Sequence, residues 1–318
     1  MKNPGRPAGA GVRHIEVDSH HTGQRLDNFL IRTLKGLPKS RVYRLLRKGE
    51  VRVNGGRVGP DYRLEEGDRI RIPPVRMAPP DTAPAPDNYR WLNDRILYED
   101  EALLAVDKPA GLAVHAGSGV ATGLIEALRA VRPDEAHIEL VHRLDRETSG
   151  CLLLAKDRSA LTALHRQLRE GEMDKRYLAL VRGRWRGRGQ RVRAALEKGR
   201  LQSGERMVRV AEDGRESESH FLPRHVYGRD TLVEIRLKTG RTHQARVHAT
   251  HLGHPIAGDD KYGDREFNRE LRARGLRRLF LHAASLAFRH PVTRQHLRVE
   301  APLPAELQSV LERLDAEA

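Results

Sequence analysis

The chain has one cysteine, no long apolar run and none of the common nucleotide-binding or hydrolase motifs. Cys151 has no partner for an intramolecular disulfide or a cysteine-pair zinc site, so a reducing cytoplasm is the expected compartment. No apolar stretch approaches the roughly 20 residues of a membrane span, and no signal peptide opens the sequence. We therefore expect a cytoplasmic protein without a membrane partner.

Acidic residues are too few to balance the basic ones. Lys and Arg number 58 against 43 Asp and Glu, which gives a net charge of +15 and a pI near 10.4. Arginine greatly outnumbers lysine, and its planar guanidinium grips phosphate through two hydrogen bonds at once. This balance predicts a nucleic acid as the partner. The 318 residues suffice for one large and one small domain.

The N-terminal part predicts an arm followed by a small domain. The first residues are Gly, Pro and basic, and we expect a flexible basic arm over residues 1–19. Residues 20–72 predict a small α+β domain whose first helix ends before Pro38. The second helix is expected to begin with Ser40 as N-cap and to end at Gly49. At helical spacing it carries a basic face: Arg41, Arg44 and Lys48.

Two turns follow the second helix. VRVNGGRV alternates about an Asn-Gly pair, a strong hairpin signal, and LEEGDRIRI supplies another turn and strand. With SRVYRLLRKGE, these stretches resemble an S4 RNA-binding domain over residues 24–72. The resemblance implies that the basic face docks on RNA. A basic face that is only solvated is the alternative.

Residues 73–92 are rich in proline and poor in large aliphatic side chains, so they predict a semi-rigid linker. A large domain is expected over residues 93–318. A strand at 233–237 alternates apolar and charged residues, and we expect it to be half exposed. Further strands are expected at 103–106, 139–142, 151–155 and around Tyr177, with helices capped by Asp157 and Thr242 and ended by Gly171 and Gly253. Strands outnumber helices, so the fold class is α+β.

In the loop HRLDRETSG, Asp145 lies between Arg143 and Arg146. The simplest interpretation is that the carboxylate forms a solvated ion pair with these arginines. Other chemistries lack their motifs. The histidines around His243 lack the spacing of a zinc pair, Ser149 lacks a G-x-S-x-G elbow, and no Walker or Rossmann glycine pattern is present. A glycosidase needs a second acid, and Glu147 is as apt to face solvent. Asp145 is left as the candidate catalytic group, with no metal expected.

HRLDRETSGCLLLAKD resembles the signature of the RluA-type pseudouridine synthases. DKPAGLAVH, DKRYLALVRG, TGRTHQARVHATHLGHPIAGDDKYG and FLHAASLAFRHP resemble further motifs of that family, in the same order, over most of residues 97–300. The resemblance implies the pseudouridine synthase fold, a large mixed and mainly antiparallel β-sheet with flanking helices. It also implies that the protein isomerises uridine in RNA to pseudouridine without a metal or other cofactor.

The resemblance assigns roles to single residues. Asp145 is implied as the essential carboxylate, which either attacks C1′ or removes the proton at C2′. We expect Arg246 to be the buried partner that keeps Asp145 charged and aimed. Tyr177 is expected to stack on the flipped uracil and to help remove the C5 proton, with an ordinary strand aromatic as the alternative. Arg143 and Arg146 are expected to grip phosphate or to fill the gap left by the base, a role for which we favour Arg143.

The stretch RGRWRGRGQRVR at 182–193 alternates arginine with glycine and Trp185. One interpretation is a mobile flap in which Arg184 and Arg186 bind RNA while Trp185 stacks on a base. A solvated loop without a role is the other interpretation.

The S4 segment and the stretches QSGERMVRV and DREFN favour family members that modify 23S ribosomal RNA, so this RNA or a pre-ribosomal particle is the expected partner. Two alternatives stay open. One is the same reaction on other ribosomal or transfer RNA uridines, and the other is a non-catalytic RNA-binding or ribosome-assembly protein with the same fold. We expect a monomer.

Overall fold

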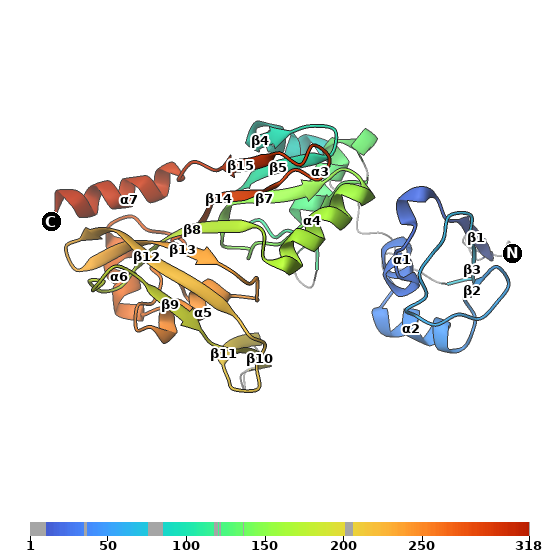
Figure 1. Ribbon diagram of the computed structural model, residues 1–318, viewed down its shortest axis with the longest axis horizontal. Coiled ribbons are helices and arrows are strands. Elements are labelled where there is room, and N and C mark those ends of the chain that lie inside the picture. The colour runs from blue at the N-terminus through green and yellow to red at the C-terminus, as the bar shows by residue number, and fades with distance from the viewer. Residues whose placement is uncertain are drawn as a thin grey trace, which may run out of the picture. The chain divides into compact units, whose positions relative to one another are not determined.

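The computed structural model describes residues 11–34, 37–75, 85–117, 120, 122–135, 137–200 and 206–317. The chain divides into two compact units, residues 1–85 and 86–318 (Figure 1). Each unit is described by itself below.

The N-terminal unit is a three-stranded antiparallel sheet in the order β1-β3-β2, packed with two helices. Its apolar core includes one face of the first helix, on which Leu26, Leu30 and Leu34 are fully buried. Asn54 and Gly55 both have positive φ, 50° and 79°, as the predicted two-residue turn requires. The elements are β1 (Arg13–Glu16), α1 (Leu26–Thr33), α2 (Lys39–Arg47), β2 (Arg52–Val53) and β3 (Arg69–Ile72).

Two expectations for this unit are wrong. The predicted arm, residues 1–19, overlaps strand β1, which pairs with β3 and sets Ile15 opposite Ile70. The Gly- and Pro-rich composition ends before this strand, and residues 1–10 lie outside the described part of the chain. The second helix begins at Lys39 with Pro38 at the N-cap, so Ser40 is not the cap. Proline has its φ already close to the helical value, which suits it to a helix start.

The large unit is built on a ten-stranded sheet in the order β4-β5-β7-β14-β8-β13-β12-β9, with β15 beside β14 and β6 beside β7. All pairs are antiparallel except β7 with β14, so the mixed, mainly antiparallel sheet of the predicted α+β fold is confirmed. The strands are β4 (Ile96–Glu99), β5 (Leu103–Lys108), β6 (Glu139–Leu140), β7 (Ser149–Ala155), β8 (Asp174–Val181), β9 (Gln190–Arg193), β12 (Glu218–Tyr227), β13 (Asp230–Leu237), β14 (Leu281–Arg289) and β15 (His296–Glu300). A separate hairpin joins β10 (Leu196–Arg200) and β11 (Arg206–Val210).

Helices flank this sheet, and the caps of α4 (Arg158–Glu170) are those predicted. The Asp157 side chain accepts a hydrogen bond from the Ala160 amide, and Gly171 ends the helix at a φ of 72°. Successive residues of β7 point into two different core clusters, so the middle of the sheet is buried on both faces. The other helices are α3 (Leu124–Val131), α5 (Gln244–His251), α6 (Arg265–Ala273) and α7 (Ala305–Ala316).

One boundary and the burial of one strand in the large unit differ from expectation. The predicted linker, residues 73–92, ends too late, because Pro86–Arg95 is a 3-10 helix whose Leu92 is fully buried in the large core. Residues 76–84 of that linker lie outside the described part of the chain. The strand at 233–237 is not half exposed, since Glu234 is buried and pairs with Arg224.

Among the helices that the structure describes, none combines the length and the apolar character that crossing a membrane would require.

Candidate active site

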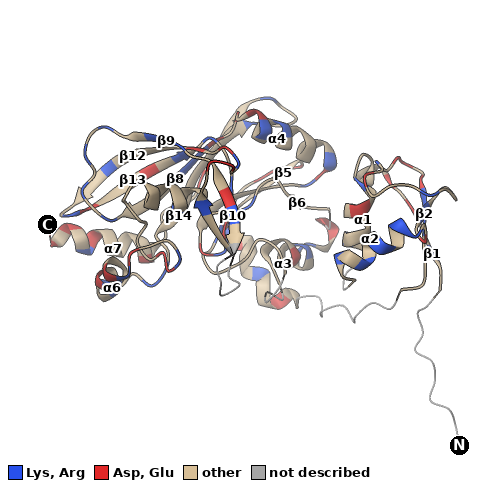
Figure 2. Cartoon of the chain, turned by 90° about the horizontal axis from the view of Figure 1, so that it is seen from below, with Lys and Arg blue, Asp and Glu red and all other residues tan. Residues whose placement is uncertain are grey.

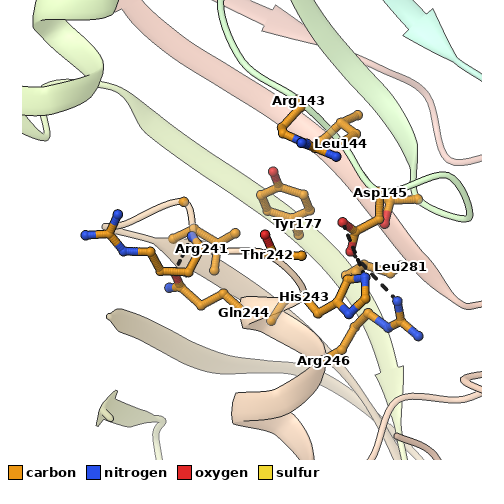
Figure 3. Close-up of a pocket in the computed structure, with 14 residues that line it drawn as sticks. Arg143, Leu144, Asp145, Tyr177, Arg241, Thr242, His243, Gln244, Arg246 and Leu281 are labelled. Atoms are coloured by element: carbon orange, nitrogen blue, oxygen red, sulfur yellow. Dashed lines mark hydrogen bonds and ion pairs between the residues drawn. The ribbon is translucent and has the colours of Figure 1, made fainter. Parts of the chain in front are cut away.

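Three elements meet at one cleft of the large unit: the loop before β7, the middle of β8 and the start of α5 (Figure 3). At the start of β7 the strand runs very close to β14, and a Cβ on Gly150 would collide with the Ala283 backbone. This close approach fixes where the preceding loop ends. The cleft is lined by Arg143, Leu144, Asp145, Thr148, Tyr177, Leu237, Gly240, Arg241, Thr242, His243, Gln244, Ala245, Arg246 and Leu281.

The loop that carries Asp145 is held by a buried lysine. Lys108, at the end of β5, is fully buried, and its Nζ donates to the carbonyls of Pro109, Leu112 and Arg146 at 2.8–3.0 Å. Burial lowers the pKa of Lys108 to about 7, although the carboxylates of Glu147 and Asp145 oppose that shift. The ammonium therefore ties the turn after β5 to the loop immediately after Asp145.

Asp145 lies between two donors, and its side chain is 22% exposed. Its Oδ2 is 3.9 Å from Nη1 of Arg246, and its Oδ1 is 3.9 Å from Nε2 of His243 (Figure 3). The expected partner is thus present, but at a distance longer than a hydrogen bond. One face of the carboxylate stays accessible from the cleft.

Arg246 makes its short contacts elsewhere. Its Nε and Nη2 donate to the two carboxylate oxygens of Asp259, both at 2.7 Å, and Asp259 is 1% exposed. Burial alone would lower the pKa of Arg246, but the Asp259 carboxylate outweighs it, so the net shift is upward. Arg246 is thus a buried cation beside Asp145, as expected, but its short bidentate pair is with Asp259, a partner that the sequence did not reveal.

Tyr177 faces the same cleft from β8 and is 8% exposed. Burial, and next the charge of Asp145, raise the pKa of its phenol, so the hydroxyl keeps its proton at neutral pH. Because Tyr177 lines the cleft, its ring and hydroxyl are within reach of a ligand there.

Similarity to known proteins identifies the family of this chain. Residues 102–251 match the RNA pseudouridylate synthase family, and residues 24–70 match the S4 domain. "Ribosomal large subunit pseudouridine synthase C" of Salmonella typhi is 54% identical over 312 residues, which cover 96% of this chain and 98% of the relative. The chain belongs to the RNA pseudouridylate synthase family.

Other similar proteins agree. The protein of the same name from Escherichia coli (strain K12) is 54% identical over 308 residues, 95% of this chain and 97% of the relative. Among solved structures, "Human RNA Pseudouridylate Synthase Domain Containing 4" matches with a TM-score of 0.60 and 25% identity, over 72% of this chain and 96% of that one. "Human RNA Pseudouridylate Synthase Domain Containing 1" matches with a TM-score of 0.55 and 28% identity, over 66% of this chain and 83% of that one. The predicted family, fold and S4 domain are confirmed, and the chain is an RNA pseudouridine synthase.

The two arginines beside Asp145 separate in this pseudouridine synthase. Arg143 is exposed and lines the cleft, as a residue that meets the RNA should. Arg146 turns away, since its Nε donates to the Gly111 carbonyl at 2.9 Å, and it does not line the cleft. The geometry favours Arg143 for contact with substrate, and Arg146 for holding the turn after β5.

The arginine-rich stretch is partly a core element of the synthase. Trp185 is 7% exposed and stacks with Phe221, at a ring-centroid distance of 5.8 Å, and with His254, at 4.6 Å. The expectation that Trp185 stacks on a base is therefore wrong, because the indole is buried in the protein core. Arg184 and Arg186 are both exposed.

In the S4 unit, the predicted basic face is solvent-accessible. Arg41, Arg44 and Lys48 are all exposed on and just after α2. Figure 2 shows basic positions, in blue, along this helix. The burial of Val42, Leu45 and Leu46 on the opposite side explains why the charged side faces outward.

Several site residues were missed or misassigned from the sequence. Thr242 does not cap α5. The N-cap is His243 at a φ of 55°, and the Gln244 side chain accepts a hydrogen bond from the Arg241 amide instead. Asp259, in the stretch GDDKYG, was missed, because no local pattern in the sequence marks it as the partner of Arg246. The described residues hold no group of three or more His, Cys, Asp or Glu side chains suited to a metal ion.

Proposed function

We propose that this pseudouridine synthase modifies uridines of 23S ribosomal RNA in the large ribosomal subunit, with Asp145 as its catalytic carboxylate. The relatives at 54% identity over nearly the whole chain are named for the ribosomal large subunit. The S4 match and a net charge of +15 fit an RNA partner. The proposed setting is the cytoplasm, with the enzyme acting as a monomer on RNA or a pre-ribosomal particle.

The single observation that carries the catalytic assignment is the cleft position of Asp145. It is the carboxylate among the residues lining the cleft, and it faces two donors across 3.9 Å. The reaction breaks the bond from N1 to C1′ of a flipped uridine and forms a bond from C5 to C1′, and the C5 proton leaves at the end. An ionised Asp145 attacks C1′ or takes the C2′ proton, and both routes use an oxygen that is not already held in a short hydrogen bond.

The neighbours of Asp145 supply the rest of the proposed chemistry. Arg246 keeps a positive charge beside the carboxylate. Tyr177 stacks on the extruded uracil, and its phenol, which keeps its proton at neutral pH, donates a hydrogen bond to the base and does not accept the C5 proton. Arg143 binds phosphate at the mouth of the cleft or fills the space that the flipped base leaves. Arg41, Arg44 and Lys48 of the S4 unit contribute non-catalytic binding.

The test is a pseudouridine map of ribosomal RNA, read by carbodiimide-dependent reverse-transcription stops. A deletion strain is complemented with the wild type or with Asp145→Asn. We expect specific stops in 23S RNA to return with the wild type alone. If both alleles restore the stops, Asp145 is not the catalytic group. If neither does, the substrate is another RNA, and the same map of transfer RNA identifies it.

A further inference from the structure

His243 lies beside Asp145, and no role has been assigned to it above. Its Nε2 is 3.9 Å from Oδ1 of Asp145, while Arg246 faces the other oxygen, Oδ2, at the same distance. The histidine side chain is 21% exposed. Each carboxylate oxygen of Asp145 therefore lies near one side-chain nitrogen, Oδ1 near His243 and Oδ2 near Arg246. What His243 can do there depends on which ring nitrogen carries the proton.

The hydrogen bonds behind His243 determine its tautomer. Nδ1 of His243 is 2.8 Å from the phenol oxygen of Tyr262, and that oxygen also accepts the backbone N–H of Val208 at 3.0 Å. A backbone N–H can only donate, and His243 is the acceptor that the described residues offer to the phenol proton. The phenol therefore donates to Nδ1. In the neutral ring the proton then sits on Nε2, which points at Asp145.

Burial favours the neutral form of the His243 ring. Burial lowers the pKa of His243, the nearby Asp145 opposes this, and Arg246 and Lys261 reinforce it, with Asp259 acting against them. The net shift is downward, so the imidazole is neutral at pH 7. Tyr262 also serves Arg246, whose guanidinium carbon lies 5.0 Å from the centre of its ring. One tyrosine thus holds both donors that face the carboxylate.

We infer that His243 is a positioning residue for Asp145. Its Nε2–H directs Oδ1 while Arg246 directs Oδ2, and Tyr262 keeps the proton on the correct nitrogen. At 3.9 Å both nitrogens are within ion-pair distance of the carboxylate but beyond hydrogen-bond distance, and on this inference the two contacts shorten in the substrate complex. The inference rests on the proposed catalytic role of Asp145. It also accounts for the left-handed backbone at His243, whose φ of 55° aims the side chain back toward the loop before β7.

Two variants of His243 distinguish a role as hydrogen-bond donor to Asp145 from a purely structural role. In His243→Gln the amide nitrogen reaches the position of Nε2 and keeps a donor for Asp145. In His243→Asn the amide reaches only the position of Nδ1, but asparagine tolerates the left-handed backbone better than glutamine. A purely structural role therefore predicts that Asn is the milder change. The positioning role predicts the opposite order.

The assay is single-turnover conversion of a 23S RNA transcript at saturating enzyme, with RNA affinity measured by filter binding. We expect His243→Asn to slow conversion by about tenfold to a hundredfold, the range for losing a hydrogen bond to a charged group, with RNA affinity unchanged within about twofold. His243→Gln should stay within a few-fold of the wild type. If Gln is as slow as Asn, or Asn is as fast as the wild type, the inference is overturned.

A spectroscopic measurement tests the tautomer directly. In protein with ¹⁵N-labelled histidine, the ring signals assigned by their loss in His243→Asn should show a protonated Nε2 and an unprotonated Nδ1. Tyr262→Phe should move them toward a mixture of both tautomers. A wild-type ring protonated on Nδ1 would refute the inference. Asp145→Asn, run in the same assay, keeps the two proposals apart: its activity would refute the catalytic role itself, whereas inactive Asp145→Asn beside fully active His243→Asn would refute only the positioning role.

Discussion

Replacing Asp259 by asparagine tests whether Arg246 is held in place by a residue outside the catalytic loop. Oδ1 of Asp259 accepts from Nη2 of Arg246 and from the amides of Lys261 and Tyr262, while Oδ2 accepts from Nε of Arg246. The asparagine carbonyl will take the Oδ1 position, where three donors converge. Its NH₂ group then faces the Nε–H of Arg246, so that one donor opposes another in a buried site.

The magnitude follows from burial. Arg246 and Asp259 are 8% and 1% exposed, and removing one partner of a buried ion pair costs about 3–5 kcal/mol. Asparagine keeps the contacts at Oδ1, so we expect the lower end, a loss of about 3 kcal/mol in the free energy of unfolding. Single-turnover conversion should also slow by at least about tenfold, because Arg246 is no longer fixed beside Asp145.

Urea unfolding followed by tryptophan fluorescence measures this loss. Both tryptophans, Trp91 and Trp185, belong to the unit of residues 86–318, so the signal reports that unit alone. The matched control is Asp260→Asn, one residue further along, whose side chain is 86% exposed and 3.7 Å from Arg272. It should change stability by less than about 0.5 kcal/mol. Equal stability of the two variants would refute the idea that Asp259 anchors Arg246.

Three further predictions concern the loop, its histidine and the S4 unit. Lys108→Met removes the donor to three carbonyls and should lower the free energy of unfolding by about 3 kcal/mol; an unchanged urea midpoint would contradict this. Burial lowers the pKa of His142 from 6.5 to about 4 in the folded protein. Between pH 6.5 and about pH 4 this histidine is therefore protonated in the unfolded chain but not in the folded one, so stability is lost as the pH falls through that range. Between about pH 7.5 and about pH 5 the wild type should lose about 2 kcal/mol more than His142→Asn, and parallel losses would rule out this origin. Neutralising Arg41, Arg44 and Lys48 together should weaken RNA binding and lower the slope of log affinity against log salt by up to about 3, with single-turnover conversion at saturation nearly unchanged; an unaltered slope would exclude this face from the RNA interface.

Much of the fold could be predicted because local signals and burial agree. The alternation of β8, the cap at Asp157 and the stop at Gly171 are each decided by residues within a few positions of one another. The position of Asp145 on a loop between two apolar segments also followed from local pattern. These features need no knowledge of the tertiary structure.

The features that could not be predicted depend on contacts between distant residues. Trp185 stands in an Arg-Gly repeat that is typical of a solvated loop, yet it is buried and stacks with Phe221 and His254, which are distant in the sequence. Lys108 finds its acceptors in backbone carbonyls, which carry no signal in the side-chain sequence. The pairing of Arg246 with Asp259 requires the turn after α5 to fold back, and nothing local in the sequence marks Asp259 as that partner.

That choice of partner matters for the proposed chemistry. A short, bidentate pair between Arg246 and Asp145 would occupy both oxygens and stabilise the resting carboxylate, which raises the barrier to any step that consumes its charge. In the observed arrangement Asp259 accepts the short hydrogen bonds of Arg246, and Asp145 has Nη1 of Arg246 and Nε2 of His243 each at 3.9 Å. The cation stays beside the carboxylate, while the carboxylate oxygens are free to meet the ribose. On the proposed mechanism, Asp259 thus contributes to catalysis without touching the substrate, by keeping Arg246 close to Asp145 but not bound to it.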